Sequence, residues 1–264
     1  MTEEIREIRY PAGRQDKPDI APAPHPDSGP ADGALPRHIA VIMDGNGRWA
    51  MSKGWRRVRG HEEGVRAVRE TTEACARLGI RQLTLYAFSS ENWRRPPVEV
   101  AILMRLLERY LVEERPTIMR NDVRLSTIGH PEGLPESCQR ELRETLAMSA
   151  ENRGMILCLA LNYGARQEIV DAARRIARRV LRGELDPEGI TEETLQQSLH
   201  QPAMPDPDLV IRTAGEMRLS NFLLWQASYA ELWVTPVQWP DFRETHLLEA
   251  IEAYRRRERR YGGL

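Results

Sequence analysis

An aspartate, two glycines and an arginine follow directly after the first strongly apolar stretch of the chain. That stretch, His38-Ile-Ala-Val-Ile-Met43, is short and rich in β-branched residues, which is typical of a strand buried on both faces. The next residues are Asp44-Gly-Asn-Gly-Arg-Trp49. Glycines let a backbone lie close to a ligand with its N–H groups toward an anion, while the carboxylate of Asp44 suits a divalent cation and Arg48 suits a phosphate. We therefore take this strand end as the centre of the candidate site.

Polar clusters also accompany other apolar, β-type stretches. They are Ser89-Ser-Glu-Asn-Trp-Arg-Arg95, Asn162-Tyr-Gly164, Arg212-Thr-Ala-Gly-Glu-Met-Arg-Leu-Ser220 and Glu231, which precedes Leu232-Trp233. Isolated polar residues after strands are ordinary in turns. Repeated clusters that contain arginine favour instead an anion site shared along one rim of the predicted sheet. We expect all of these clusters, Glu231 included, to lie on that rim.

Other motifs and residues allow alternative interpretations. Gly45-Asn-Gly-Arg-Trp-Ala50 fits the dinucleotide-binding pattern G-x-G-x-x-G/A, but that pattern needs a second strand ending about twenty residues later, and here the next strand ends only near Phe88. The sequence contains no His-Glu-x-x-His, Gly-x-Ser-x-Gly or Gly-Lys-Ser/Thr motif. His61 could donate to a phosphate or only cap a helix. Trp49 and Trp93 could line an apolar ligand channel, although large aromatic residues more often belong to a core.

The bulk composition disfavours several classes of protein. A formal net charge of −1 over 264 residues suggests neither general nucleic-acid binding nor a polybasic membrane anchor. Cys75, Cys138 and Cys158 lie far apart, which argues against a zinc site or a disulfide scaffold and fits a reducing compartment. The N-terminus lacks the pattern of a signal peptide, and no apolar stretch approaches the length of a membrane span. We expect a cytoplasmic protein.

From Arg37 onward, β-type runs alternate with helical patterns. The predicted strands are 38–43, 83–88, 123–128, 155–161, 209–212 and 232–235. The apolar residues from Val98 to Leu111 keep the three-four spacing of one buried helical stripe, and this helix is expected to reach about Met119 with an end or kink at Pro116. The other predicted helices are 61–78, 136–151, 166–182 and 241–259. This alternation predicts a single α/β domain with a largely parallel, six-stranded sheet flanked by helices, whose ligands collect beyond the carboxyl ends of the strands.

Residues 1–36 differ in composition from the rest of the chain, since many of them are prolines with glycine, alanine and aspartate between them. Pro22-Ala-Pro-His-Pro26 cannot form a helix or a sheet ladder, and few apolar residues are available to build a core. We expect a disordered tail at 1–36, dispensable for the chemistry, followed by a catalytic domain at 37–264.

The chain from about His38 to Gly263 closely resembles the cis-prenyltransferases. The matching segments are HIAVIMDGNGRWA, RGHEEG, LTLYAFSSENWRRP, LNYGARQEI, DLVIRTAGEMRLSNFLLWQ, YAELWV and WPDF. The resemblance implies a homodimeric α/β enzyme with a hydrophobic tunnel, which adds isopentenyl diphosphate in cis geometry to an allylic diphosphate such as geranyl or farnesyl diphosphate. It also implies a medium-to-long polyprenyl diphosphate as product, a precursor of a lipid carrier for cell-wall synthesis. Ala87, a small residue on the expected tunnel wall, leaves room for elongation, and a peripheral contact of the enzyme with the membrane through its product is expected.

The same resemblance assigns roles to individual residues. It implies catalytic roles for Asp44 and Asn92, with Asp44 and Glu231 binding Mg²⁺, and it places Ser89 and Asn92 near the proton removed after condensation. The residues implied to bind the substrates are Gly45, Asn46, Gly47, Arg48, Trp49, Arg57, His61, Ser89, Ser90, Glu91, Trp93, Arg95, Arg212, Arg218, Leu219 and Ser220. Arg260-Tyr-Gly262 resembles a terminal Arg-x-Gly motif that reaches the site of a partner subunit.

Some points stay open from the sequence. Asn92 is not basic, so the departing diphosphate is an alternative acceptor for the proton. The family pattern Arg-Thr-Gly-Gly-Glu is replaced here by Arg212-Thr-Ala-Gly-Glu216, whose alanine methyl could crowd the backbone if φ were positive there. A non-catalytic partner subunit is the alternative function, but such a chain should have lost Asp44 or the diphosphate-binding arginines, and all of them are present.

Overall fold

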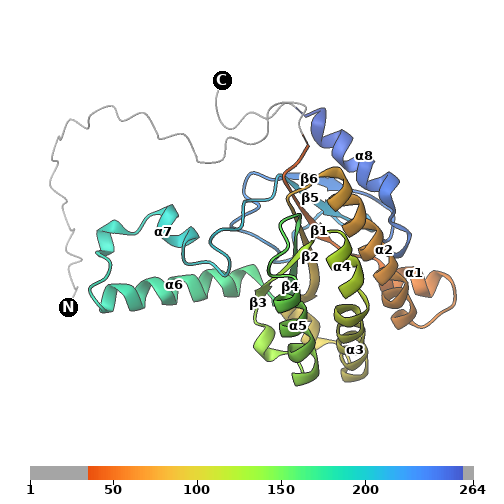
Figure 1. The fold of residues 1–264 in the computed structure, drawn as a ribbon, viewed down its shortest axis with the longest axis horizontal. Helices are drawn as coiled ribbons and strands as arrows, with labels where there is room; N and C mark the ends of the chain where they lie inside the picture. Colours follow the sequence, from red (N-terminus) through yellow and green to blue (C-terminus); the bar gives the residue numbers. More distant parts are fainter. Residues whose placement is uncertain (1–34, 258–264) are drawn as a thin grey trace, which may run out of the picture.

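One parallel β-sheet forms the centre of the molecule (Figure 1). The computed structural model describes residues 35–257, so most of the proposed tail and the Arg260-Tyr-Gly262 motif lie outside the described residues. The strands are β1 His38–Ile42, β2 Gln82–Ser89, β3 Arg124–Gly129, β4 Ile156–Tyr163, β5 Leu209–Arg212 and β6 Glu231–Val234. Their order is β3-β4-β2-β1-β5-β6, and every neighbouring pair is parallel. The predicted α/β domain with six strands is confirmed.

Strand β1 lies inside the sheet, between β2 and β5. All five of its residues are buried, which explains why its sequence is continuously apolar rather than alternating. At its carboxyl end Ile42 pairs with Arg212 of β5, so the chain segments after these two strands emerge side by side. The topology thus brings two of the predicted polar clusters together.

Eight α-helices are found among residues 35–257. They are α1 Asn46–Ser52, α2 Arg57–Leu78, α3 Pro97–Glu113, α4 Arg115–Arg120, α5 Glu136–Met148, α6 Ala165–Leu181, α7 Glu192–Gln196 and α8 Glu244–Arg255. Short 3₁₀ turns lie at Ser90–Arg94, Pro131–Gly133, Pro187–Gly189 and Trp239–Asp241. The five predicted helical regions are confirmed, whereas α1 and α7 were not predicted.

The predicted break at Pro116 is confirmed. Helix α3 ends at Glu113, and Pro116 lies in the first turn of α4. Backbone N–H groups in a first turn have no acceptor within the helix, so the missing N–H of a proline breaks no hydrogen bond there. Glu114 at the junction is buried, and both of its oxygens accept hydrogen bonds from Arg69 of α2, at 2.8 and 3.0 Å from Nε. The junction is therefore held against α2 rather than left free.

The two faces of the sheet are covered differently. On one face, Ile39 and Val41 pack in a large cluster with buried residues of α2, α3, α5 and α8. On the other, Ala40 and Ile42 pack in a smaller cluster with Phe222 and other residues from the start of α6 and the irregular segment 199–230. Because successive residues of a strand face opposite sides, β1 contributes to both cores.

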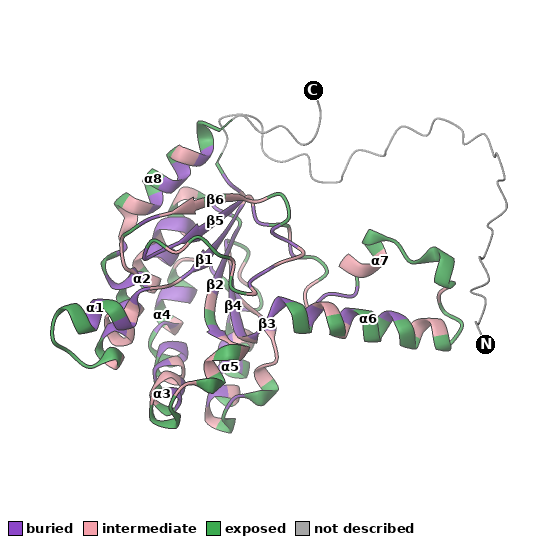
Figure 2. Cartoon of the chain, turned by 180° about the vertical axis from the view of Figure 1, so that it is seen from behind, coloured by how far each residue is buried: buried purple, intermediate pink, exposed green. Residues whose placement is uncertain are grey.

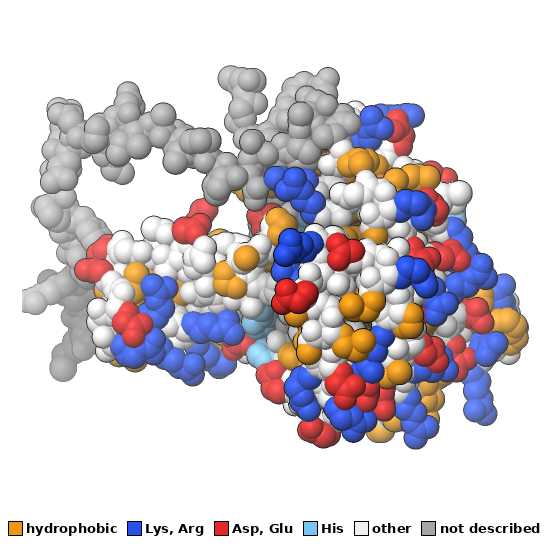
Figure 3. Space-filling view, viewed as in Figure 1, with side chains coloured by type: hydrophobic (Ala, Val, Ile, Leu, Met, Phe, Trp, Pro, Cys, Tyr) orange, Lys and Arg blue, Asp and Glu red, His pale blue; other side chains and the backbone are white. Residues whose placement is uncertain are grey.

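Helices α6 and α7 project from the sheet as an arm, residues 165–196 (Figure 1). Most residues of the arm are exposed or partly exposed, and in α6 only Ala165, Glu168, Ala172 and Ile176 are buried (Figure 2). Charged side chains of both signs lie on the visible side of this arm, with hydrophobic ones between them (Figure 3). Across residues 35–257, no helix combines the length and the hydropathy needed to cross a bilayer.

Candidate active site

The turn between β1 and α1 forms the centre of the site. Gly45 has φ +98°, and a Cβ atom at this position would lie 2.8 Å from the Cβ of Ala214 and 2.9 Å from that of Gln238. Only glycine fits both the conformation and the space. Helix α1 begins directly afterwards at Asn46, so the N–H groups of its first turn lack acceptors within the helix. The segment predicted as an anion-binding loop is therefore a tight turn into a short helix.

Asp44 is held by groups from both neighbouring strand ends. Its Oδ1 accepts a hydrogen bond from the N–H of Gly45 at 2.6 Å, and its Oδ2 accepts one from Arg212 Nη2 at 2.9 Å. Arg48 Nη2 lies 3.4 Å from Oδ1. Partial burial by itself would raise the pKa of this carboxyl, but the hydrogen bonds from Arg212 and Gly45 and the charges of Arg212 and Arg48 outweigh burial and hold the pKa below its usual range. Asp44 is therefore ionised at neutral pH.

Arg212 connects Asp44 to the segment after β5. Its side chain is 6% exposed, and Nη1 donates to Ser220 Oγ at 2.7 Å and to the carbonyl oxygen of Arg218. Its Nε is buried and has no hydrogen-bond partner among residues 35–257. The following segment folds back sharply, with positive φ at Ala214 (+68°) and Ser220 (+50°). Ala214, which replaces a glycine of the family pattern, therefore lies in the left-handed region, where the Cβ atom of an alanine is strained.

A series of ion pairs near the surface links helix α1 to the segment after β5. Arg48 Nη1 donates to Glu216 Oε1 at 3.0 Å, and Arg218 donates to Oε2 of the same residue. The hydrogen bond and charge of Arg218 lower the pKa of Glu216, and the charge of Arg48 lowers it further. Glu216 thus holds two of the predicted substrate-binding arginines. Its role was missed from the sequence, although it stands inside the quoted motif.

The residues after β2 form a 3₁₀ turn that fixes Asn92. Ser89 N–H donates to Asn92 Oδ1 at 3.1 Å, and the Ser89 side chain accepts a bond from the backbone of Asn92. The carbonyl oxygen of the Asn92 side chain is thus already used. Glu91 Oε1 accepts from Asn221 Nδ2 at 2.8 Å, which ties this turn to the segment after β5.

Gly164, after β4, leaves room for that contact. A Cβ atom at Gly164 would lie 2.7 Å from both Asn221 Nδ2 and Ser90 Oγ. The third polar cluster, Asn162–Gly164, therefore supports the site through its backbone shape. Asn162 itself accepts a hydrogen bond from Trp93 Nε1 at 2.8 Å.

Helix α2 adds His61 and Arg57. Burial lowers the pKa of His61 to about 4. The positive charges of Arg95 and Arg57 act in the same direction, and the negative charge of Glu99 opposes them. His61 is therefore neutral at pH 7. Arg95 Nη1 donates to Glu99 Oε1 at 2.8 Å. The exposed Arg57 lies over Gly47, where a Cβ atom would be 2.9 Å from Arg57 Nε.

An apolar cavity of about 170 Å³ opens beside these groups. Asn46, His61, Asn92 and Arg95 provide its polar lining. Its apolar lining comes from β2, β4, α2 and α3, and includes Ala87, Leu103, Leu107 and Tyr110. The polar and apolar parts together suit an amphipathic ligand with an anionic head. This cavity is the feature that corresponds to the predicted hydrophobic tunnel.

Three predicted residues do not line this cavity. Trp49 is buried and packs edge-to-face against Trp55, with ring centroids 5.6 Å apart, and Trp93 packs in the same manner against Phe88 at 5.0 Å. Neither tryptophan is part of the cavity wall. Leu219 is partly buried against the smaller core cluster.

The expected position of Glu231 is wrong. Glu231 begins β6 and pairs with Leu209, at the amino end of the parallel strands, whereas Asp44 follows their carboxyl ends. At a rise of about 3.3 Å per residue, the two carboxylates are more than about 10 Å apart along the strands, too far to share one metal ion within a chain. Glu231 instead accepts a hydrogen bond from Arg257.

Comparisons with known proteins agree with this architecture. The family model "Putative undecaprenyl diphosphate synthase" matches residues 42–262. The chain is 50% identical over 230 residues to an isoprenyl transferase of Geobacillus kaustophilus, covering 87% of this chain and 90% of that protein. It is 48% identical over 229 residues to the (2E,6E)-farnesyl-diphosphate-specific ditrans,polycis-undecaprenyl-diphosphate synthase of Vibrio vulnificus, covering 87% and 91%.

A solved structure is also similar. Lavandulyl diphosphate synthase from Lavandula x intermedia, in complex with dimethylallyl diphosphate, superposes with a TM-score of 0.84 at 40% sequence identity. The match covers 86% of this chain and 98% of that chain.

Proposed function

Because this chain belongs to the undecaprenyl diphosphate synthase family of prenyltransferases, we propose that it joins isopentenyl diphosphate to an allylic diphosphate with cis geometry. One observation carries this proposal: Met43 and Asn46, on either side of the arginine-bound Asp44, line an apolar cavity together with His61 and Arg95, so a diphosphate and its hydrocarbon chain can be bound together. Geranyl or farnesyl diphosphate is the expected starter. The product is a medium-to-long polyprenyl diphosphate that serves as a lipid-carrier precursor for cell-wall synthesis.

The two diphosphates are assigned to neighbouring segments. The N–H groups that begin α1, with Arg48, Arg57 and Arg95, would bind the allylic diphosphate, and Arg212, Arg218 and Ser220 would bind isopentenyl diphosphate. When the allylic carbon–oxygen bond breaks, its electron pair leaves with the diphosphate. Fixed arginines and backbone N–H groups stabilise that developing negative charge. An incoming diphosphate would replace Glu216 as the anionic partner of Arg48 and Arg218.

The new carbon–carbon bond takes its electrons from the double bond of isopentenyl diphosphate. A proton then leaves the adjacent carbon, which restores a double bond. Asn92 is suited to orient substrate rather than to accept this proton, because its amide is not basic and its Oδ1 is bound to Ser89 N–H. The departing diphosphate remains the alternative acceptor.

Magnesium is the expected cofactor. Asp44 offers an ionised carboxylate whose side chain is 30% exposed, which fits an ion that takes one or two carboxylates and the phosphates of a substrate. Arg48 and Arg212 face the same carboxylate, so their charge disfavours a bare divalent cation and favours one that arrives with a diphosphate. When bound, Mg²⁺ would neutralise charge on the leaving diphosphate.

Chain length depends on the cavity. Its volume of about 170 Å³ lies below the range of roughly 300–1,000 Å³ typical of ligand sites, so the cavity must widen as a long product grows. A homodimer and a membrane contact through the product stay predictions.

The test is incorporation of radiolabelled isopentenyl diphosphate with geranyl or farnesyl diphosphate, with and without Mg²⁺, resolved by chain length. We expect a metal-dependent ladder that Asp44→Ala abolishes and that Asp186→Ala, an exposed aspartate of the arm, leaves intact. No incorporation by the folded wild-type chain with either starter would contradict prenyl transfer and favour the partner-subunit alternative.

A further inference from the structure

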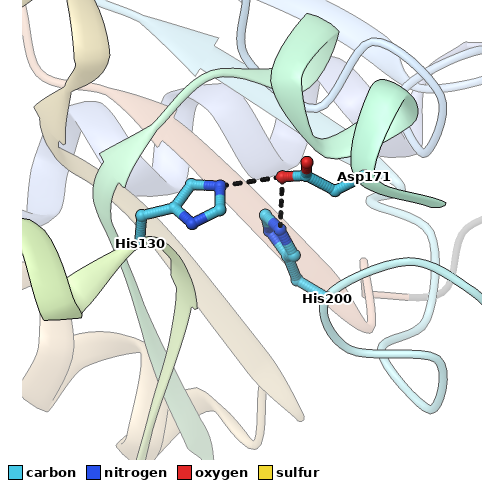
Figure 4. A group of neighbouring side chains, drawn as sticks. All are labelled: His130, Asp171 and His200. Carbon is cyan, nitrogen blue, oxygen red and sulfur yellow. Dashed lines mark hydrogen bonds and ion pairs between the residues drawn. The ribbon is translucent and has the colours of Figure 1, made fainter. Parts of the chain in front are cut away.

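Three potential metal ligands meet at the base of the arm, away from Asp44 (Figure 4). His130 follows β3, Asp171 lies on α6, and His200 precedes β5 in the chain. His130 Nε2 is 2.9 Å from Asp171 Oδ2, and His200 Nε2 is 4.0 Å from the same oxygen. Strand β3 is three strands away from β1, which places this cluster about 14 Å across the sheet from the end of β1.

We propose that His130, Asp171 and His200 form a binding site for a first-row divalent transition metal, with zinc as its expected occupant. Two imidazole nitrogens and one carboxylate oxygen are typical zinc ligands, and three protein ligands leave a fourth position for water. Magnesium and calcium, which prefer oxygen ligands, are poor occupants. The three ligand atoms already lie within 4.8 Å of one another. Tetrahedral zinc would set them about 3.4 Å apart, a change of about 0.6 Å or less for each measured pair.

His200 provides an independent indication of a ligand. Its side chain is 7% exposed, yet its Nε2 is buried without a hydrogen-bond partner among the described residues. This nitrogen faces Asp171 (Figure 4), but 4.0 Å is too long for a hydrogen bond. A buried polar nitrogen without a partner is unfavourable. A metal ion between His200 and Asp171 would satisfy it.

The groups around the cluster orient its ligands. Gln167 Nε2 and Arg174 Nη1 donate to Asp171 Oδ1, at 3.0 and 3.2 Å, which leaves Oδ2 facing the two histidines. His130 Nδ1 lies 2.8 Å from Glu132 Oε1. A carboxylate behind a ligating imidazole fixes the ring and its tautomer in metal sites. Metal at His130 Nε2 would take the place of a proton shared with Asp171.

Binding at His200 Nε2 requires one defined change. The N–H of Gly129 now donates to His200 Nδ1 at 3.2 Å, so that nitrogen carries no proton. A neutral imidazole that binds metal through Nε2 carries its proton on Nδ1. Glu168 Oε1 lies 3.6 Å from His200 Nδ1 and would accept this proton after the two atoms approach by about 0.5 Å. Tyr163 and Gln226 hold Glu168 in place through its Oε2. Metal binding should therefore exchange the Gly129 hydrogen bond for one to Glu168.

The first experiment measures zinc binding to the full chain by calorimetry, in millimolar Mg²⁺ to occupy oxygen sites. We expect one equivalent of Zn²⁺ to bind to the wild type, and His130→Asn and Asp171→Asn each to weaken binding at least tenfold. The matched control is His246→Asn, which replaces a histidine of α8 whose Nδ1 accepts a hydrogen bond from Arg243. It should bind zinc as the wild type does. Equal zinc affinity in Asp171→Asn and His246→Asn, or no zinc binding by the wild type, would overturn the site.

Two further measurements separate a metal site from a merely structural ion pair between His130 and Asp171. Zinc at a hundredfold excess over Kd should raise the unfolding temperature of the wild type by roughly 5–10 °C and leave that of Asp171→Asn unchanged. In ¹⁵N NMR spectra, zinc should shift the amide of Gly129 and move the ring proton of His200 to Nδ1. An unchanged Gly129 amide at saturating zinc would contradict ligation by His200.

Discussion

Replacing Gly60 of α2 by alanine should disable the candidate active site without any change to a polar group. A Cβ atom at Gly60 would lie 1.8 Å from the carbonyl oxygen of Asn46, and real Cβ contacts are essentially never shorter than 3.0 Å. The first residue of α1 must therefore move by at least about 1.2 Å. Misplacing a substrate-binding segment by about 1 Å lowers activity roughly 100-fold. We expect Gly60→Ala to lower kcat/KM by about that factor.

The expected effect on stability is smaller and has two opposing parts. Alanine inside a helix is favoured over glycine by about 1 kcal/mol. Overpacking at a well-filled contact costs about 1–3 kcal/mol. The free energy of unfolding should therefore fall by at most about 2 kcal/mol, which corresponds to a decrease in Tm of no more than about 8 °C. The Gly60→Ala protein stays folded at assay temperature.

Gly64→Ala is the matched control, one turn further along α2. Its Cβ atom would lie 2.5 Å from Asn46 Oδ1, which is the end of a side chain and can rotate away, and 3.0 Å from Trp239. We expect a loss in kcat/KM of less than about tenfold. Both variants are assayed by isopentenyl diphosphate incorporation at saturating farnesyl diphosphate and by thermal unfolding followed by circular dichroism. Wild-type kcat/KM in Gly60→Ala, or an equal loss in both variants, would refute the packing argument.

Three further predictions concern charges. Arg212→Lys should lower kcat/KM for isopentenyl diphosphate by roughly 10²–10³-fold with little change in Tm, because one lysine ammonium cannot reach Asp44 and Ser220 together. Steady-state kinetics measure this loss, and a kcat/KM near that of the wild type would refute the proposed role of Arg212. Mg²⁺ should bind measurably by calorimetry only when a non-hydrolysable diphosphate is present, and binding of similar strength without it would contradict the charge argument around Asp44. Burial lowers the pKa of His38 to about 4, so the contribution of the neutral imidazole to stability is complete above pH 6.5 and decreases as the pH falls toward 4. Between pH 7 and pH 5, the free energy of unfolding measured in urea should fall by about 2 kcal/mol more in the wild type than in His38→Gln. An equal dependence on pH in the two proteins would contradict this.

The strands were predictable because burial on both faces leaves a clear apolar signal. Strand β1 is an example, since all five of its residues are buried and its alternate residues pack into a core on each face of the sheet. Helix α1 gave no such signal. It has only seven residues, its N-cap is Gly45 and its second residue is Gly47, and it is stabilised by packing against α2 at Gly60 rather than by its own sequence.

The site was predictable where residues follow a strand and was not where they precede one. Asp44 and Arg212 follow adjacent parallel strands and therefore meet. Glu231 precedes its strand, and in a parallel sheet that places it at the opposite edge. The cluster of His130, Asp171 and His200 could not be found from spacing, because it joins residues 41 and 70 positions apart in sequence through the folding of the arm.

The pairing of Ile42 with Arg212 has an evolutionary consequence. The two proposed diphosphate segments emerge from strands of one hydrogen-bonded ladder, whose spacing of about 4.8 Å hardly varies between proteins. Mutation can scarcely alter the distance between the two headgroups without breaking the sheet. From this chain we therefore expect relatives named for products as different as lavandulyl and undecaprenyl diphosphate to differ mainly in the residues that line the cavity. Diversification in such a fold would fall on the cavity-lining residues of β2, β4, α2 and α3, where a single side-chain change alters the space for hydrocarbon.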